Sequence, residues 1–240
     1  MTLPPVLLER FWTRQARVRS RQEQWQGGAR LASREKSHSR TVPAVRRAGS
    51  ARVLRIIGGR WRGRKLRFPA SAEIRPTPDR VRETLFNWLA AAPQGAACLD
   101  LFAGSGALGL EALSRGAAHV TFVEQDAPAA RELRSRLEEW QAVGSQVVRT
   151  DALRYLAGTP RPFDIVFLDP PFKAPLLESV ATLLESQPWL QPNALIYVEC
   201  PARAGLPSLP QSWRLLRAKR AGEVGYHLFA HTAPEHRQSA

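Results

Sequence analysis

The stretch Asp100-Leu101-Phe102-Ala103-Gly104-Ser105-Gly106-Ala107-Leu108-Gly109 decides the fold of this chain. It follows a short apolar run that is typical of a buried strand, and it opens an apolar segment with helical spacing. Glycines at such a junction let the backbone turn sharply and approach a ligand, at which the next helix points its N-terminus. The glycine spacing satisfies G-x-G-x-x-G, and Glu124 lies 20 residues after Gly104. A nucleoside-containing cofactor is therefore predicted, either a nicotinamide dinucleotide or S-adenosylmethionine.

Strand-like and helix-like segments alternate from this loop to the end of the chain. We expect strands at 97–101, 118–123, 146–150, 163–168, 194–199, 213–219 and 225–230. We expect helices at 106–115, 126–141, 152–157 and 174–186. This alternation predicts an α/β, Rossmann-like fold with a mostly parallel sheet and right-handed crossovers. Only the short stretch Ala221-Gly222-Glu223-Val224 separates the last two strands, which predicts an antiparallel hairpin at one edge.

The positive charge is concentrated at the front of the chain. The formal net charge of +14 divides into +9 over residues 1–52, +6 over 53–90 and −1 over 91–240. A near-neutral body behind a basic front is typical of a protein with a polyanionic partner such as RNA. We expect a basic, disordered arm over 1–52, an RNA-binding hairpin and helix over 53–92, and a catalytic, cofactor-binding domain over 93–240.

The remaining composition favours a reducing compartment. Cys98 and Cys200 both lie in apolar runs and are expected to be buried free thiols. No metal-ligand spacing is present, and no apolar stretch approaches the length of a membrane span. We therefore expect a cytoplasmic, monomeric protein with neither a metal nor a membrane partner.

The basic hairpin is predicted between the arm and the glycine loop. Residues 53–57 and 65–68 have strand-like patterns, and glycines lie between them. The predicted RNA-binding residues on its exposed face and tip are Arg60, Trp61, Arg62, Arg64 and Lys65. Basic residues that flank an aromatic ring suit phosphate contact and base stacking, although a solvated hairpin covering the sheet edge would look the same.

A helix is predicted directly after the hairpin, ending near Pro93. Thr77 is expected as its N-cap, with Pro78 at the first helical position. Arg75 and Arg80 are predicted to contact RNA phosphate or the cofactor, unless they pair with neighbouring acids.

Acids follow three successive predicted strands. Asp100 is placed to bind a cofactor's ammonium or sulfonium, and it would repel a pyrophosphate. Glu124 is placed to accept two ribose hydroxyls, while Asp151 is placed to accept the adenine amine and Ala152 to leave room for the ring. One acid after a strand is commonplace, but three favour S-adenosylmethionine. The predicted cofactor-binding residues are Asp100, Phe102, Gly104, Ser105, Gly106, Glu124, Asp151 and Ala152.

The fourth strand delivers Asp169-Pro170-Pro171-Phe172, which we predict to be the catalytic residues. An exocyclic base amine is a poor nucleophile because its lone pair is delocalised into the ring. Asp169 can accept the amine's hydrogen bonds, the Pro170 carbonyl can assist, and Phe172 offers a ring on which the base can stack. Alone, the two prolines would indicate only a strand terminator.

Four motifs together resemble the RsmD family of bacterial 16S ribosomal RNA guanine-N2 methyltransferases. They are Arg55-Ile56-Ile57-Gly58-Gly59-Arg60-Trp61-Arg62-Gly63-Arg64, the helix from Arg75-Pro76-Thr77 to Asn87, the glycine loop and Asp169-Pro170-Pro171-Phe172. The resemblance covers about residues 53–230. It implies S-adenosylmethionine as donor, a seven-stranded methyltransferase sheet, and a guanine(966)-N2 type of activity on 16S rRNA in a 30S subunit or assembly intermediate. The long arm departs from the family pattern.

The residue type at position 169 also favours guanine. Guanine presents N1–H beside N2–H₂, all donors, and an ionised carboxylate is an acceptor only. Adenine and cytosine amines lie beside a ring acceptor, which suits Asn instead. Three alternatives stay open: an amine methyltransferase for adenine or cytosine, a NAD-dependent oxidoreductase, and a non-catalytic RNA-binding assembly protein.

Overall fold

The computed structural model describes residues 52–68, 77–172 and 176–232. The arm up to Ala51 and the predicted RNA contact Arg75 lie outside the described residues, so what we predict for them stays a prediction.

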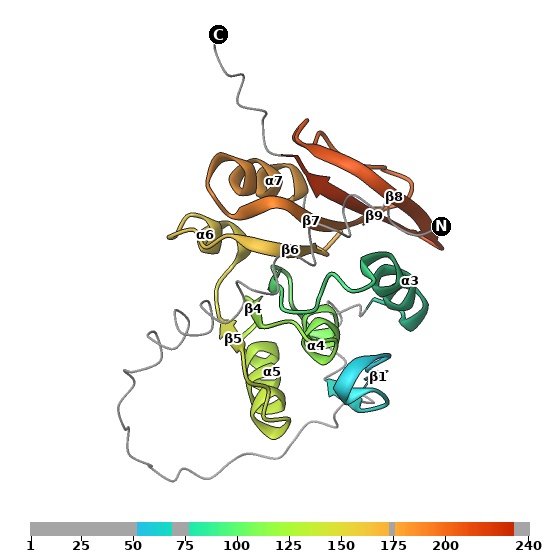
Figure 1. Cartoon of the computed structure of the whole chain (residues 1–240), viewed down its shortest axis with the longest axis vertical. Helices are drawn as coiled ribbons and strands as arrows, with labels where there is room; N and C mark the ends of the chain where they lie inside the picture. The colour runs from blue at the N-terminus through green and yellow to red at the C-terminus, as the bar shows by residue number, and fades with distance from the viewer. Residues whose placement is uncertain (1–51, 69–76, 173–175, 233–240) are drawn as a thin grey trace, which may run out of the picture.

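A seven-stranded sheet forms the centre of the molecule, in the order β5-β4-β3-β6-β7-β9-β8 (Figure 1). Its strands are β3 (Ala97–Asp100), β4 (His119–Val123), β5 (Ser145–Val148), β6 (Phe163–Leu168), β7 (Leu190–Pro201), β8 (Trp213–Ala221) and β9 (Val224–His231). The strands β3 to β7 pair in parallel, and β9 runs antiparallel to both β7 and β8. The strand order reverses between β3 and β6, which is where α/β sheets bind ligands. The predicted fold class and edge hairpin are confirmed.

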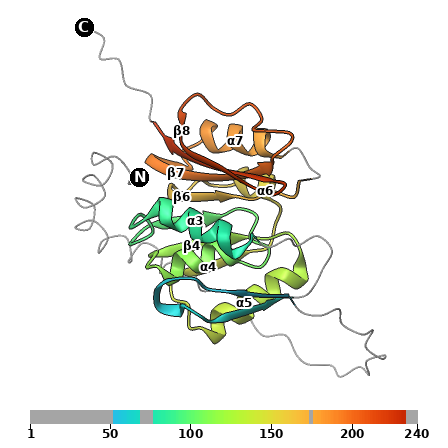
Figure 2. The same cartoon turned by 90° about the vertical axis from the view of Figure 1, so that its right-hand side faces the viewer.

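Helices cover both faces of this sheet (Figures 1 and 2). The helices are α3 (Asp79–Leu89), α4 (Ala107–Ser114), α5 (Ala127–Glu139), α6 (Ala152–Leu156) and α7 (Leu177–Ser186). The first three share one hydrophobic cluster, and the last two belong to the cluster on the opposite face. β3, β4 and β6 are buried along their whole length, as central parallel strands must be. Across all the helices and strands, the ends differ from the predicted ones by up to four residues, because local pattern locates element ends poorly.

The basic front forms the predicted hairpin, from β1 (Arg52–Arg55) and β2 (Lys65–Phe68). A single 3₁₀ turn, η3 (Gly59–Trp61), lies at its tip. The hairpin forms a separate two-stranded sheet and packs beside α4 and α5 (Figure 2). Its apolar residues Leu54, Ile56 and Leu66 join the same hydrophobic cluster as α3 and α4.

Within the residues that the structure describes, no helix is long and apolar enough to cross a membrane. Nor do these residues contain a group of three His, Cys, Asp or Glu side chains that could hold a metal ion. Cys98 and Cys200 are both buried and free, as predicted.

Candidate active site

Four carboxylates lie at the carboxyl ends of four neighbouring parallel strands. In sheet order, Asp151 follows β5, Glu124 follows β4, Asp100 ends β3 and Asp169 follows β6. The register pairs Asp100 with Phe167, so Asp100 and Asp169 emerge on the same face of the sheet. The structure therefore brings the four predicted acids to one edge, at the point where the strand order reverses.

Asp100 is the most enclosed of these four acids, with 3% of its surface exposed. Its Oδ2 accepts a 2.9 Å hydrogen bond from the backbone N–H of Gly109, in the first turn of α4. Burial raises the pKa of Asp100 to about 7; the Gly109 bond lowers it, and the charges of Asp169 and Glu124 raise it further. A cationic group bound at this edge would stabilise the ionised form of Asp100.

The glycine loop is too tight for side chains at its turning points. Gly104 and Gly106 have positive φ angles of 51° and 75°. A Cβ on Gly106 would lie 2.5 Å from a methyl carbon of Leu133 in α5. Phe102 and Ser105 are partly exposed in this loop, as residues that contact a ligand must be.

Glu124 and Asp151 each accept hydrogen bonds from backbone N–H groups. Glu124 accepts hydrogen bonds of 2.6 Å from Gly104 and 2.7 Å from Asp126, and burial raises its pKa. Asp151 is exposed and caps α6 by accepting a 2.9 Å bond from the N–H of Arg154, while Ala152 behind it is buried. Their predicted contacts with a ribose and an adenine stay predictions.

Asp169 is held by a residue for which we predicted another role. Thr77 Oγ1 donates a 3.1 Å hydrogen bond to Asp169 Oδ2, and Thr77 is 4% exposed. The prediction that Thr77 caps the helix is wrong, because α3 starts at Asp79 with Pro78 as its N-cap and without a side-chain cap. A buried hydroxyl needs a buried partner, whereas water can reach the exposed first turn of α3. The predicted helix end near Pro93 is also wrong, since Ala90 already takes a φ of 49°.

A further acid, Glu199, lies beside Asp169 and was not predicted. It sits in β7 with 2% of its surface exposed, and the Tyr197 hydroxyl donates a 2.7 Å hydrogen bond to its Oε1. Burial raises the pKa of Glu199 well above its usual value, and the negative charge of Asp169 adds to this. Burial also raises the pKa of Asp169 to about 6, against the lowering effect of the Thr77 bond. A lone acid inside the apolar run 194–200 was the available signal.

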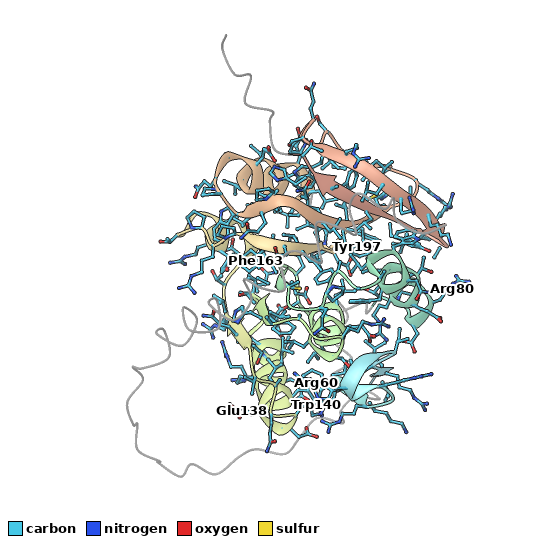
Figure 3. All side chains as sticks on the ribbon, in the orientation of Figure 1. Arg60, Arg80, Glu138, Trp140, Phe163 and Tyr197 are labelled. Carbon is cyan, nitrogen blue, oxygen red and sulfur yellow. The ribbon has the colours of Figure 1, made fainter. Side chains whose placement is uncertain are left out.

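The residues that follow Asp169 differ in exposure. Pro170 is buried and fixes the chain behind the carboxylate, while Pro171 is exposed. Phe172 is 38% exposed, so its ring is free to contact a ligand. Figure 3 shows Tyr197 on the side of the sheet that carries α3, which is the side Thr77 approaches.

The structure corrects the role predicted for Trp61. Its side chain is 5% exposed and packs on Trp140, with 5.2 Å between ring centroids. Its backbone N–H donates to Ser114 Oγ, at 2.9 Å. Trp61 is therefore a packing residue that docks the hairpin tip on α4 and α5, and its ring is not free to stack on a base. An indole at a glycine-rich tip is ambiguous in sequence because its large apolar area gains most from burial.

The basic side chains around Trp61 stay on the surface. Arg60, Arg62, Arg64 and Lys65 are all exposed. Arg60 lies over the Trp61 ring at 4.3 Å, and Arg64 and Lys65 line an open depression with Trp140. Arg80, in the first turn of α3, points away from the sheet (Figure 3).

The hairpin tip lies at the opposite end of α4 from the glycine loop. Gly58 and Trp61 bond to the last turn of α4, whereas Gly106 precedes its first turn. An eight-residue helix is about 12 Å long. The structure therefore does not bring the predicted RNA-binding tip next to Asp169, and an RNA that touches both must span this distance.

Glu111 in α4 anchors the hairpin, and we did not predict it. Its side chain is fully buried and accepts 2.8 Å hydrogen bonds from the N–H groups of Ile57 and Gly58. The guanidinium of Arg115 donates a further 2.8 Å bond, and that of the buried Arg82 lies 3.7 Å away. In sequence Glu111 looks like an ordinary helix-surface acid, because the two backbone N–H groups that it binds are more than 50 residues away.

Comparison with known proteins agrees with this geometry. Residues 54–230 match the protein family described as Conserved hypothetical protein 95. The chain is 52% identical over 186 residues to Ribosomal RNA small subunit methyltransferase D of Escherichia coli K12, covering 78% of this chain and 93% of that protein. The chain belongs to the RsmD family. A second member of the family, from Haemophilus influenzae, is 47% identical over 180 residues and covers 73% and 93% of the two chains.

Solved structures show the same architecture. A putative methyltransferase from Escherichia coli is 51% identical, with a TM-score of 0.71, covering 75% of this chain and 99% of that one. An RNA methyltransferase from Salinibacter ruber in complex with S-adenosyl-L-homocysteine is 16% identical, with a TM-score of 0.51, covering 69% and 100%. This second likeness is one of fold alone. The seven-stranded methyltransferase-type sheet of the RsmD family is thus present in this chain.

Proposed function

We propose that this protein transfers a methyl group from S-adenosylmethionine to the exocyclic N2 of one guanine in 16S rRNA, an activity of the guanine(966)-N2 type. The observation that carries the proposal is the position of Asp169. It lies beside three further strand-end acids, and Thr77 holds one of its oxygens. Its other oxygen, Oδ1, takes no part in that bond and is the group that we assign to the base.

The strand-end acids fit a cationic donor. S-adenosylmethionine carries an ammonium and a sulfonium, and it supplies an activated methyl group. Burial raises the pKa of Asp100 to about 7, the charges of Asp169 and Glu124 add to the rise, and a cationic ligand would offset both effects. Pyrophosphate would instead add negative charge here, which disfavours a dinucleotide. We assign the ammonium side to Asp100, the ribose to Glu124 and the adenine to Asp151, with Phe102, Gly104, Ser105, Gly106 and Ala152 shaping the site.

The acceptor side needs orientation more than covalent chemistry. The N2 lone pair of guanine forms the new N–C bond while the electrons of the broken C–S bond go to sulfur, and N2 then loses a proton. Asp169 is placed to accept hydrogen bonds from N1–H and N2–H and to take that proton. Phe172, exposed beside it, offers a face on which the base can stack. A guanine must leave its helix to reach this site.

The surface charge fits an RNA substrate. Arg60, Arg62, Arg64 and Lys65 are exposed on the hairpin, and Arg80 is exposed on α3. We propose that they bind phosphates of 16S rRNA, within a 30S subunit or an assembly intermediate in the cytoplasm, and that one copy of the protein suffices. The arm, at +9, is proposed to add phosphate contacts.

The test is methyl transfer from labelled S-adenosylmethionine to naked 16S rRNA, 30S particles and 70S ribosomes. The full chain and a version lacking residues 1–50 are compared at several salt concentrations. We expect label in guanosine N2 for the full chain, and weaker RNA binding with a smaller salt dependence without the arm. An unchanged salt slope would exclude phosphate contacts by the arm. Thermal stabilisation by NAD but not by S-adenosylhomocysteine would exclude the proposed chemistry.

A further inference from the structure

A buried carboxyl group, a half-buried carboxyl group and two hydroxyls lie together at the acceptor side of the site. They come from three elements: Asp169 follows β6, Tyr197 and Glu199 belong to β7, and Thr77 precedes α3. Glu199 is 2% exposed and Thr77 is 4% exposed, so neither exchanges its partners freely with water. Nothing proposed above gives Glu199 or Tyr197 a task.

Each of the two hydroxyls binds one of the two carboxyl groups. The Tyr197 hydroxyl donates to Glu199 Oε1, at 2.7 Å. The Thr77 hydroxyl donates to Asp169 Oδ2, at 3.1 Å. Because the register pairs Leu168 with Val198, Glu199 lies next to Asp169 across the two strands. Two ionised carboxylates side by side would repel each other, which favours a proton on the more buried one, Glu199.

The surroundings of Glu199 favour the same state. Its ionisable neighbours are Asp169 across the end of β6, Tyr197 and Cys200 on its own strand, and Tyr226, its register partner on β9. None of these four groups is a cation at any pH. Burial and the charge of Asp169 both raise the pKa of Glu199, so this acid holds its proton while Asp169 loses its own.

We infer that Glu199 is a positioning residue, which stays a neutral acid beside Asp169 and is oriented by the Tyr197 hydroxyl. Thr77 holds Oδ2 of Asp169 and leaves Oδ1 to the amine of the base. The neutral Glu199 keeps the pair at a single negative charge, carried by the group that touches the substrate. This inference rests on the proposed function, because it assigns Asp169 to the acceptor base.

Two substitutions of Glu199 distinguish a neutral acid at this position from an ionised one. Glu199→Gln keeps an acceptor for Tyr197 and carries no charge, so it reproduces the protonated acid. Glu199→Leu has a similar size but loses the bond from Tyr197. We expect Leu to lower kcat by about tenfold or more, with the KM for RNA little changed, and Gln to rescue most of that loss. Asp164→Asn is the matched control, because Asp164 is a buried acid at the opposite end of β6.

The pH profile of kcat is the readout that a merely structural role would not move. The acidic limb reports ionisation of Asp169. It should lie at the same pH in the wild type and in Glu199→Gln, because both carry a neutral group at position 199. A limb displaced by about one pH unit or more to lower pH in Glu199→Gln would show that Glu199 is ionised, and a large loss of kcat in that variant would show the same. Either result overturns the inference.

A second measurement needs no RNA. If Glu199 is neutral in the fold, the Gln variant gains thermal stability on the wild type throughout the rise from pH 5 to pH 7, because the unfolded wild-type chain releases a proton that the folded protein keeps. If Glu199 is ionised in the fold, the difference stops changing once Asp169 has lost its proton, and the inference fails. Failure of the proposed function would look different, since the wild type would then transfer no methyl to RNA whatever the stability difference does.

Discussion

Thr77 and Asp169 are 92 residues apart in sequence, yet Thr77 Oγ1 donates a 3.1 Å hydrogen bond to Asp169 Oδ2. The bond connects the segment before α3 to the carboxyl end of β6. It therefore joins the basic front of the chain to the acceptor side of the catalytic sheet. A displacement of α3 would move Thr77 and release one oxygen of Asp169.

Thr77→Val tests this bond with a side chain of the same shape. The Thr77 bond lowers the pKa of Asp169, which burial raises to about 6. Without the bond, that pKa rises further, so the acidic limb of kcat moves to higher pH and kcat near pH 6 falls about tenfold. Affinity for S-adenosylhomocysteine should not change. Thr84→Val, on the same helix, is the control, since Thr84 bonds only to a helix carbonyl; an equal effect of both variants would contradict the account.

Asp169→Asn tests the acceptor itself. The amide keeps the size of the side chain but presents a donor toward guanine and cannot take a proton. We expect methyl transfer to guanine to fall by about 10²-fold or more, while S-adenosylhomocysteine binding measured by calorimetry stays within a few-fold. Near-normal turnover would contradict the role given to Asp169.

Asp100→Asn should raise the melting temperature at alkaline pH and weaken cofactor binding. Because the pKa of Asp100 is raised to about 7 in the fold, the folded protein binds this proton more tightly than the unfolded chain does. The contribution of Asp100 to stability is thus greatest below about pH 4, and it is lost as the pH rises through about 7. At pH 8 the ionised, buried carboxylate of Asp100 destabilises the wild type, so Asp100→Asn should melt at a higher temperature. At pH 4 the two should melt alike, and the variant should lose affinity for S-adenosylmethionine.

Gly59→Ala and Gly63→Ala form a matched pair for the docking of the hairpin. Both glycines have positive φ, 73° and 82°. A Cβ on Gly59 would lie 1.9 Å from the carbonyl oxygen of Ser114, whereas one on Gly63 would meet nothing within 4 Å. Gly63→Ala should cost about 1 kcal/mol of unfolding free energy, from backbone strain alone.

Gly59→Ala should cost at least twice as much, measured by urea denaturation. It should also weaken RNA binding, since the hairpin must leave α4 to accommodate the methyl group. Equal losses in the two variants would mean that the tip is not docked on Ser114.

The structure confirms the predictions that depend only on neighbouring residues in the sequence. The run 163–168 is apolar and bounded by Pro170, and β6 has those same bounds. The acids at positions 100, 124, 151 and 169 were placed at strand ends by counting, and parallel strands bring such ends to one edge.

What could not be predicted depends on distant partners. Thr77 was assigned to a helix cap because its buried acceptor lies 92 residues away. Trp61 was placed on the surface because Trp140 and Ser114, which bury it, follow far along the chain. Glu199 stood in an apolar strand without an evident partner, and only the register of β6, β7 and β9 places Asp169 and Tyr226 beside it.

The most direct test of the central claim is the identity of the methylated nucleoside. 16S rRNA or 30S particles would be labelled with the full chain and S-adenosylmethionine, digested to nucleosides and separated. The account predicts that the label appears as N2-methylguanosine and that Asp169→Asn abolishes it. Label in a methylated adenosine or cytidine, or no transfer from a protein that binds S-adenosylmethionine, would contradict it.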